Sequence, residues 1–281
     1  MCAGMRFAPR GPEGRTAPFR PFLAFRPTEF APSDPSGRAA RARRWVTVET
    51  HPGPVGGQVR IATAGVVLQA DLVVPEDAMG IVAFAHGSGS GRFSPRNRFV
   101  ASALNKAGLG TLLADLLTAS EERVDARTAA LRFDIDLLTR RLIGIVDWLS
   151  EDEATQRLPI GLFGASTGAA AAVRAGAACP GLVRAIVSRG GRVDLAEDEL
   201  PRCTAPTLLI VGGDDQEVLA LNRQALDQSS ATAKQLVVVA GATHLFEERG
   251  ALEQVARSAA TWFLEHLGAT APTAAMRSNQ S

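Results

Sequence analysis

Short apolar runs separated by turn residues dominate the chain from about residue 45 onward. The first of them, WVTVET, QVRIAT and VVLQADLVVP, predict strands, and we expect the first few to be antiparallel. Beyond Gly91 the apolar runs alternate with stretches of helical period. That alternation is typical of a parallel sheet with helices on both faces. The pattern therefore predicts an α/β fold with a mostly parallel central sheet.

Predicted helices and strands follow one another in βαβ order to the end of the chain. Helices are expected near residues 97–107, 129–150, 167–178, 217–228 and 251–267. Strands are expected at the start of IVAFAHGSGSG and at GTLLADL, LPIGLFGA, VRAIVSR, PTLLIVGG and KQLVVVA. Several of these strands are nearly continuous Val, Ile and Leu, as expected where a strand is buried on both faces.

Three regions follow from this pattern. Residues 1–44 are rich in Arg, Pro and Gly and show neither strand nor helix period, so we expect a disordered extension that activity does not require. Residues 45–268 carry the predicted elements and are expected to form one catalytic domain, because 281 residues with 46% hydrophobic content can bury a sizeable core. Residues 269–281 are expected to form a flexible tail.

Charge and cysteine content narrow the class of partner. Thirty Lys and Arg residues balance 29 Asp and Glu residues, so nothing global attracts nucleic acid or an anionic membrane. Cys2, Cys179 and Cys203 lack zinc-site spacing, and we expect reduced thiols and no bound metal. Without an apolar run of membrane-spanning length or a secretory signal, the chain is expected to be cytoplasmic, to bind a small molecule, and to be a monomer or homodimer.

The segment LPIGLFGASTGAAAA carries the first candidate for chemistry. An apolar strand leads into Gly164-Ala165-Ser166-Thr167-Gly168, and an Ala-rich helix follows. This is the form of a nucleophile elbow, in which a sharp turn lifts a serine hydroxyl above the sheet. By composition alone the pentapeptide is weak evidence, and an inert serine in a buried turn is the alternative. The flanking strand and helix favour Ser166 as a nucleophile.

A serine nucleophile needs a base, because its hydroxyl is hardly ionised near neutral pH. Of the four histidines, His244 lies in a loop between the last strand and the last long helix, whereas His51 and His266 are poorly placed. An acid that orients the base should follow PTLLIVGG, where Asp214 and Asp215 stand next to each other. Either aspartate could instead be a turn or helix-cap residue.

The order serine, aspartate, histidine, each after a predicted parallel strand, is the order of the α/β-hydrolases. Over about residues 55–267 the chain resembles the dienelactone hydrolase-like branch of that superfamily, through HGSGSGRFSPRNR, GLFGASTGAAAA, LLIVGGDDQEV and GATHLFEE. The family's G-x-x-D-x-x-V turn implies Asp215 as the acid, with Asp214 as the fallback. Dienelactone hydrolases proper use a cysteine nucleophile, where this chain has Ser166.

The resemblance also implies an oxyanion hole. His86-Gly87-Ser88-Gly89 is similar to the family's His-Gly oxyanion loop, so we expect the backbone N–H groups of Ser88 and Thr167 to bind the oxyanion. His86 is expected to brace this loop by a hydrogen bond and not to act as a second base. The loop also lacks the GxGxxG spacing of a dinucleotide site.

The implied activity is hydrolysis of a small ester, lactone or thioester through an acyl-enzyme, without a cofactor. Too few residues separate VRAIVSR from PTLLIVGG for a large lid. Two groups of arginines flank the predicted site, Arg92 with Arg96 and Arg98, and Arg189 with Arg192. Arg92 and Arg189 are candidates for binding an anionic substrate, although such arginines more often brace loops through local acids.

Two other functions fit the same residues. An acyltransferase or perhydrolase would use the same acyl-enzyme with an acceptor other than water. A non-catalytic binding protein on a hydrolase scaffold is the alternative from another class, and the intact serine, aspartate and histidine argue against it.

Overall fold

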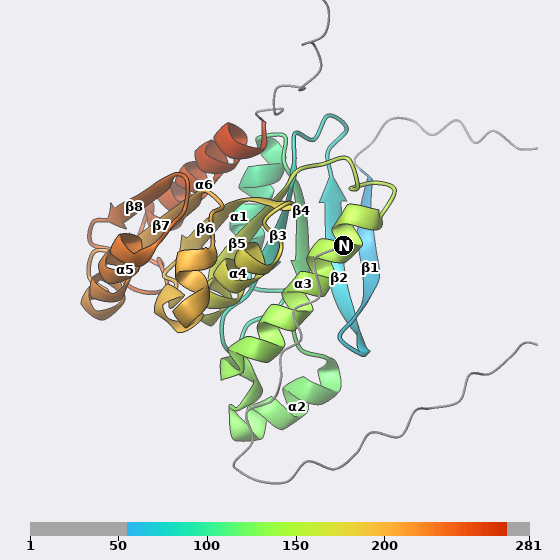
Figure 1. Ribbon diagram of the computed structural model, residues 1–281, viewed down its shortest axis with the longest axis horizontal. Coiled ribbons are helices and arrows are strands. Elements are labelled where there is room, and N and C mark those ends of the chain that lie inside the picture. The colour runs from blue at the N-terminus through green and yellow to red at the C-terminus, as the bar shows by residue number, and fades with distance from the viewer. Residues whose placement is uncertain (1–54, 269–281) are drawn as a thin grey trace, which may run out of the picture. The chain divides into compact units, whose positions relative to one another are not determined.

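The structure is a computed structural model that describes residues 55–268. Its eight-stranded sheet has the order β1-β2-β4-β3-β5-β6-β7-β8 (Figure 1). The strands are β1 (Val55–Thr63), β2 (Val66–Val74), β3 (Ile81–Ala85), β4 (Gly110–Ala114), β5 (Ile160–Ala165), β6 (Val183–Arg189), β7 (Thr207–Gly212) and β8 (Lys234–Val239). The β1–β2 and β2–β4 pairs are antiparallel and all other pairs are parallel, so the predicted mostly parallel sheet is confirmed.

The expectations for residues 1–44 and 269–281, and for the strand WVTVET, lie outside the described residues.

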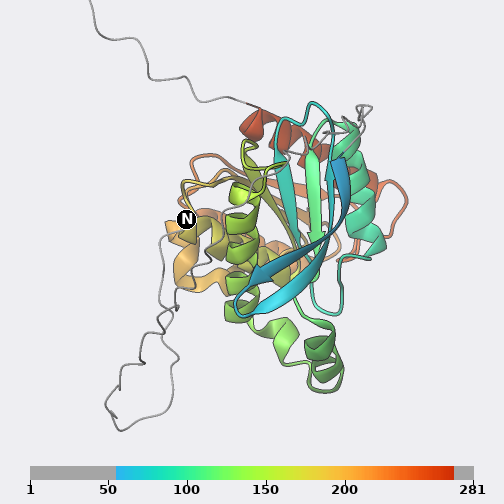
Figure 2. The same ribbon diagram turned by 90° about the vertical axis from the view of Figure 1, so that its right-hand side faces the viewer.

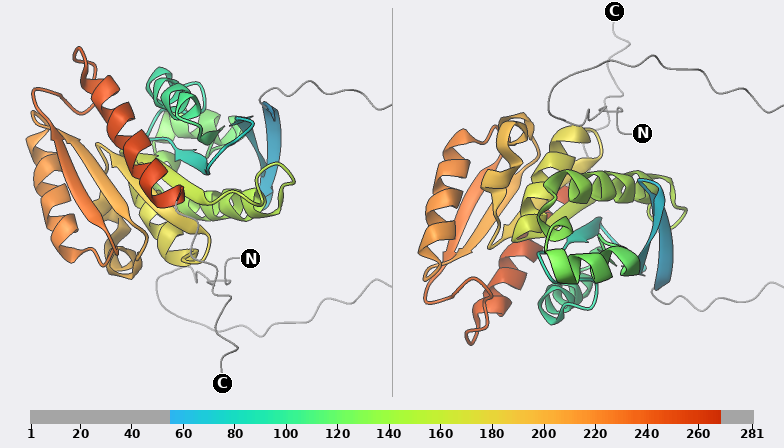
Figure 3. Two further views of the ribbon diagram at one scale, coloured as in Figure 1. Left: turned by 90° about the horizontal axis from the view of Figure 1, so that it is seen from above. Right: turned by 90° about the horizontal axis from the view of Figure 1, so that it is seen from below.

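Helices α1 (Pro95–Lys106) and α6 (Ala251–Leu267) pack on one face of the sheet. Helices α3 (Ile135–Glu151), α4 (Thr167–Ala178) and α5 (Gln216–Gln228) pack on the other, and the views along the vertical axis separate the two layers (Figure 3).

Strand β5 shows why the central strands are apolar throughout. All six of its residues are buried. Leu162 packs in the core on the α3 and α4 side, whereas its neighbour Phe163 packs on the α1 and α6 side, where its ring lies 4.8 Å from that of Phe84. Alternate side chains thus fill two separate cores, and neither face of the strand can be polar.

The segment between β4 and α3 differs from the predicted single helix over residues 129–150. Helix α2 (Ala119–Thr128) comes first and is followed by a 3₁₀ turn, η1 (Leu131–Phe133), before α3 begins. Ala129 has a left-handed backbone with φ of 55°, and Asp134 caps α3 by accepting from the Leu137 N–H at 2.9 Å. Figure 2 shows α2 at the lower end of the sheet, where β4 ends. The hydrophobic period missed α2 because Asp125 is its one buried residue.

The connection from β6 to β7 is short and contains only the 3₁₀ segment η2 (Val193–Arg202). A large lid is therefore absent there, as expected.

Cys203 is a free buried thiol, and burial raises its pKa to about 11. Within residues 55–268, no helix combines the length and the apolar character needed to span a bilayer.

Candidate active site

Ser166 occupies a strained turn between β5 and α4. Its φ of 50° and ψ of −122° lie in a region that residues with a Cβ rarely adopt, and such strain persists where the surroundings enforce it. Gly164 and Gly168 allow the turn: a Cβ on Gly164 would lie 2.8 Å from the Ala169 nitrogen, and one on Gly168 would lie 2.6 Å from the His86 carbonyl oxygen. The local structure is the predicted elbow, with the serine half-buried at the helix N-terminus.

Asp215 and His244 meet after the ends of β7 and β8. The His244 Nδ1 lies 2.7 Å from the Asp215 Oδ2, so Nε2 is the ring nitrogen that the carboxylate does not contact. Asp215 is partly buried after β7, whereas Asp214 is exposed and its N–H donates to the Ala242 carbonyl. Between the two aspartates, the structure thus brings Asp215 to the histidine.

The end of β6 connects Ser166 to His244. The Ser166 N–H donates to the Arg189 carbonyl oxygen at 3.3 Å. At the next residue, Gly190, a Cβ would lie 3.5 Å from the His244 Cε1. The histidine ring therefore lies next to Gly190, which directly follows β6 and the backbone partner of the serine. The three predicted side chains thus share one edge of the sheet.

The loop after β3 lies directly against Ser166. A Cβ on Gly87 would lie 2.9 Å from the Ser166 Cβ, so only glycine permits this approach. The Ser88 and Thr167 hydroxyls are 3.2 Å apart and tie the loop to the start of α4. Among residues 55–268, neither the Ser88 nor the Thr167 backbone N–H donates to a protein acceptor, which leaves both available.

His86 holds this loop. Its Nε2 accepts from the Leu116 N–H at 2.9 Å, so the proton is on Nδ1, which donates to the Gly87 carbonyl oxygen at 3.0 Å. Burial lowers the pKa of His86 and keeps the ring neutral. Of the other histidines, His266 packs edge-on against Trp262 in α6, and His51 lies outside the described residues.

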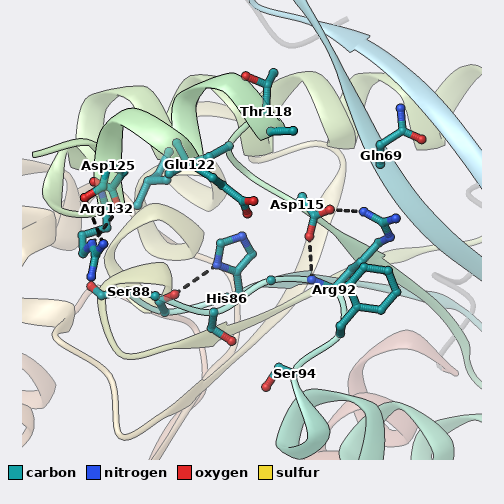
Figure 4. A pocket seen from close by; sticks show the side chains of 18 of the residues that line it. Gln69, His86, Ser88, Arg92, Ser94, Asp115, Thr118, Glu122, Asp125 and Arg132 are labelled. Carbon is teal, nitrogen blue, oxygen red and sulfur yellow. Dashed lines mark hydrogen bonds and ion pairs between the residues drawn. The ribbon is translucent and has the colours of Figure 1, made fainter. Parts of the chain in front are cut away.

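A pocket of about 1050 Å³ opens beside the loop after β3 and is walled by α2 (Figure 4). Gly87 and Ser88 line it, whereas Ser166 and His244 do not. Glu122 points from α2 into the space beside His86, and burial, followed by repulsion from Asp115, raises the pKa of Glu122. Sequence reasoning missed this wall, although the spacing of Thr118 and Glu121, which form a capping box, marked the start of α2.

Four of the five arginines that flank the site have carboxylate partners. Arg92 pairs with Asp115, Arg96 with Glu247, Arg98 with Asp71 and Arg192 with Asp194. Arg189 differs: across the described part of the chain, no hydrogen bond or ion pair reaches its side chain, and its Nη1 is buried without a partner. The same part of the chain holds no group of three or more His, Cys, Asp or Glu suited to a metal.

Comparison with known proteins finds relatives of one family and one fold. Residues 68–267 match the model of the dienelactone hydrolase family. A crystal structure of dienelactone hydrolase from Anabaena variabilis is 54% identical, with a TM-score of 0.74, over 77% of this chain and 99% of that one. Est1E from Butyrivibrio proteoclasticus, at 18% identity and a TM-score of 0.64 over 76% of this chain and all of that one, shares the fold.

Two Mycobacterium tuberculosis proteins, provisionally named phosphoribosyl transferases, are 54% identical to this chain over 217 residues. The match covers 77% of this chain and 48% of each of them, so this chain spans about half the length of those relatives.

Proposed function

Because the chain belongs to the dienelactone hydrolase family, we propose that it is a serine hydrolase that cleaves a small ester, lactone or thioester through an acyl-enzyme. The observation that carries the proposal is the 2.7 Å contact of His244 with Asp215 at the sheet edge that also presents Ser166. A hydrolase of this kind needs a nucleophile, a base and a group that orients the base, and these residues supply all three.

Each residue has a defined part in the proposed reaction. Asp215 holds His244 so that its Nε2 faces the nucleophile and takes the Ser166 proton as the hydroxyl attacks the substrate carbonyl. The Ser88 and Thr167 N–H groups donate to the oxyanion of the tetrahedral intermediate. His244 then gives the proton to the leaving alcohol. A water molecule repeats the attack on the acyl-enzyme, again with His244 as the base.

The name of the Mycobacterium tuberculosis relatives does not change this proposal. It is given to proteins about twice as long as the region they share with this chain. In this chain, the elbow and the His244–Asp215 pair support acyl chemistry. We therefore extend hydrolysis, and not transfer of a phosphoribosyl group, to this chain.

Labelling with a fluorophosphonate tests the nucleophile. The probe is expected to modify Ser166, located by mass spectrometry, and the label should be lost in Ser166→Ala and weakened in His244→Ala. Turnover of 4-nitrophenyl butanoate should fall by about 10⁴- to 10⁶-fold in Ser166→Ala. A folded wild-type protein that takes no label between pH 6 and 9 would refute the proposal. Adding a competing alcohol, thiol or peroxide and analysing the products separates hydrolysis from acyl transfer.

A further inference from the structure

Asn222 is a polar side chain that is completely buried in helix α5. None of its surface is exposed, and its Nδ2 donates to two carbonyl oxygens, those of Val218 and Gly191, each at 2.8 Å. Both neighbours are acceptors, so the two protons of the amide nitrogen serve them at once. Burying an amide costs free energy that burying a leucine of similar size does not. The bond to Gly191, which lies outside the helix, is therefore what the asparagine adds.

Gly191 belongs to the loop 190–192, which directly follows β6. Its carbonyl is buried, and in the described part of the chain no other group donates to it. A Cβ on Gly191 would overlap the Ser188 Oγ and would lie 2.5 Å from the Ala169 Cβ. The loop thus packs closely against β6 and α4, and Asn222 satisfies a carbonyl that would otherwise be buried unpaired.

The same loop contacts two of the three proposed catalytic residues. The Arg192 N–H donates to the Ser166 carbonyl oxygen at 3.1 Å. On the other side of Gly191, a Cβ on Gly190 would lie 3.5 Å from the His244 Cε1. A displacement of Gly191 is therefore transmitted in one direction to the turn that holds the nucleophile and in the other to the ring of the base.

The third proposed catalytic residue, Asp215, begins the helix that carries Asn222. Asp215 is the N-cap residue of α5, and its carbonyl oxygen accepts from the Leu219 N–H at 2.9 Å. Asn222 follows Asp215 by two helical turns, so the two residues lie on the same face of α5. Asn222 thus ties the helix that begins at the acid to the loop between the nucleophile and the base.

We propose that Asn222 is a positioning residue that keeps α5 and the loop 190–192 in register, and so sets the geometry among Ser166, His244 and Asp215. The inference rests on the proposed function, since it names a further residue on which that reaction depends. Because Asn222 is fully buried, it acts through the loop and does not touch the substrate. Its loss should slow the attack on the ester and leave substrate binding almost unchanged, since the attack depends more steeply on the alignment of the reacting groups.

Two substitutions separate the bond to Gly191 from the rest of the side chain. Asn222→Leu removes both bonds, whereas Asn222→Thr keeps a hydroxyl whose single proton can serve the Val218 carbonyl within the helix. In both variants kcat on 4-nitrophenyl butanoate is expected to fall by about 10- to 100-fold, with KM changed by less than about threefold. Fluorophosphonate titration gives the concentration of active enzyme. A kcat restored to the wild-type value in Asn222→Thr overturns the inference.

Asn105→Leu is the matched control. The Asn105 Nδ2 also donates to a backbone carbonyl, that of Leu109 at 3.0 Å, but it lies between α1 and the start of β4, at the opposite edge of the sheet from Ser166. The control should lower the urea midpoint much as Asn222→Leu does and change kcat by less than about threefold. A loss of kcat in Asn105→Leu as large as that in Asn222→Leu would show a general effect of stability and overturn the inference.

Amide exchange separates this inference from the proposed function. Followed by NMR, the Arg192 N–H should exchange at least about tenfold faster in Asn222→Leu than in the wild type, and less than about threefold faster in Asn105→Leu. An enzyme whose Ser166 is labelled, but whose kcat and Arg192 exchange are unchanged in Asn222→Leu, overturns the inference alone. Faster exchange in a protein that takes no label upholds the anchoring of the loop by Asn222 and overturns the proposed hydrolysis.

Discussion

At the residue scale, two neighbouring aspartates offer a direct test of the base. Asp215→Asn is expected to lower kcat by about 10⁴-fold, because the amide no longer fixes the tautomer of His244 or stabilises its cation. Asp214→Asn is the matched control. Its side chain is exposed one residue away, so kcat should change by less than about threefold.

Steady-state kinetics of both variants on 4-nitrophenyl butanoate supply the measurement. Retained kcat in Asp215→Asn, or a loss in Asp214→Asn as large as that in Asp215→Asn, would contradict the assignment. The sequence alone left the two aspartates open, because both follow the same strand and either could cap α5. Only the resemblance to the family and the observed contact separate them.

At the element scale, the elbow between β5 and α4 does not tolerate a side chain at Gly168. A Cβ on Gly168 would overlap the carbonyl oxygens of Ala85 and His86, which are backbone atoms and cannot swing away. Gly168→Ala is therefore expected to lower the free energy of unfolding by about 1–3 kcal/mol. Gly181→Ala is the control, because its Cβ would meet nothing within 4 Å.

Urea unfolding of both variants tests this difference. Gly181→Ala should leave the midpoint unchanged or raise it slightly, since alanine restricts the unfolded chain more than glycine does. If Gly168→Ala unfolded at the wild-type midpoint, α4 would not be pinned against the loop after β3. The proposed oxyanion hole would then have no rigid support from that contact.

Elements with a strong apolar period could be predicted from the sequence to within a residue or two. The helix expected at 167–178 is α4, and the one expected at 251–267 is α6. Helix α2 could not be found in this way, because it buries almost nothing and is held by its Thr118 capping box and by the Arg132–Asp125 ion pair. Local polar contacts, which leave no hydrophobic period, build the wall of the pocket.

At the scale of the whole molecule, strand order and loop position predicted which residues gather at one edge. Ser166, Asp215 and His244 are up to 78 residues apart in number, yet each follows a parallel strand of one sheet. The ion-pair partners of the arginines near this edge could not be predicted in the same way. Arg92 and Arg189 look alike in the sequence, but Asp115 pairs with the first, while the second is buried alone.

At the same scale, one buried histidine contributes to the acid sensitivity of the fold just below neutral pH. Among the described groups with a shifted pKa, His86 is the one whose ordinary pKa, about 6.5, lies between pH 5 and 7. Because folding lowers that pKa, the unfolded chain binds more protons than the folded chain as the pH falls below about 6.5. The contribution of His86 to the free energy of unfolding therefore decreases from pH 7 toward its pKa in the folded chain, by up to about 1.4 kcal/mol per pH unit.

His86→Gln isolates this contribution, since its side-chain oxygen can still accept from the Leu116 N–H and the residue no longer titrates. The variant is expected to be less stable than the wild type at pH 7 and to lose less stability between pH 7 and 5. Urea midpoints at pH 7, 6 and 5 give the two slopes. Parallel slopes would mean that His86 protonates in the folded chain without cost. The neutral ring would then not be what fixes the oxyanion loop beside Ser166.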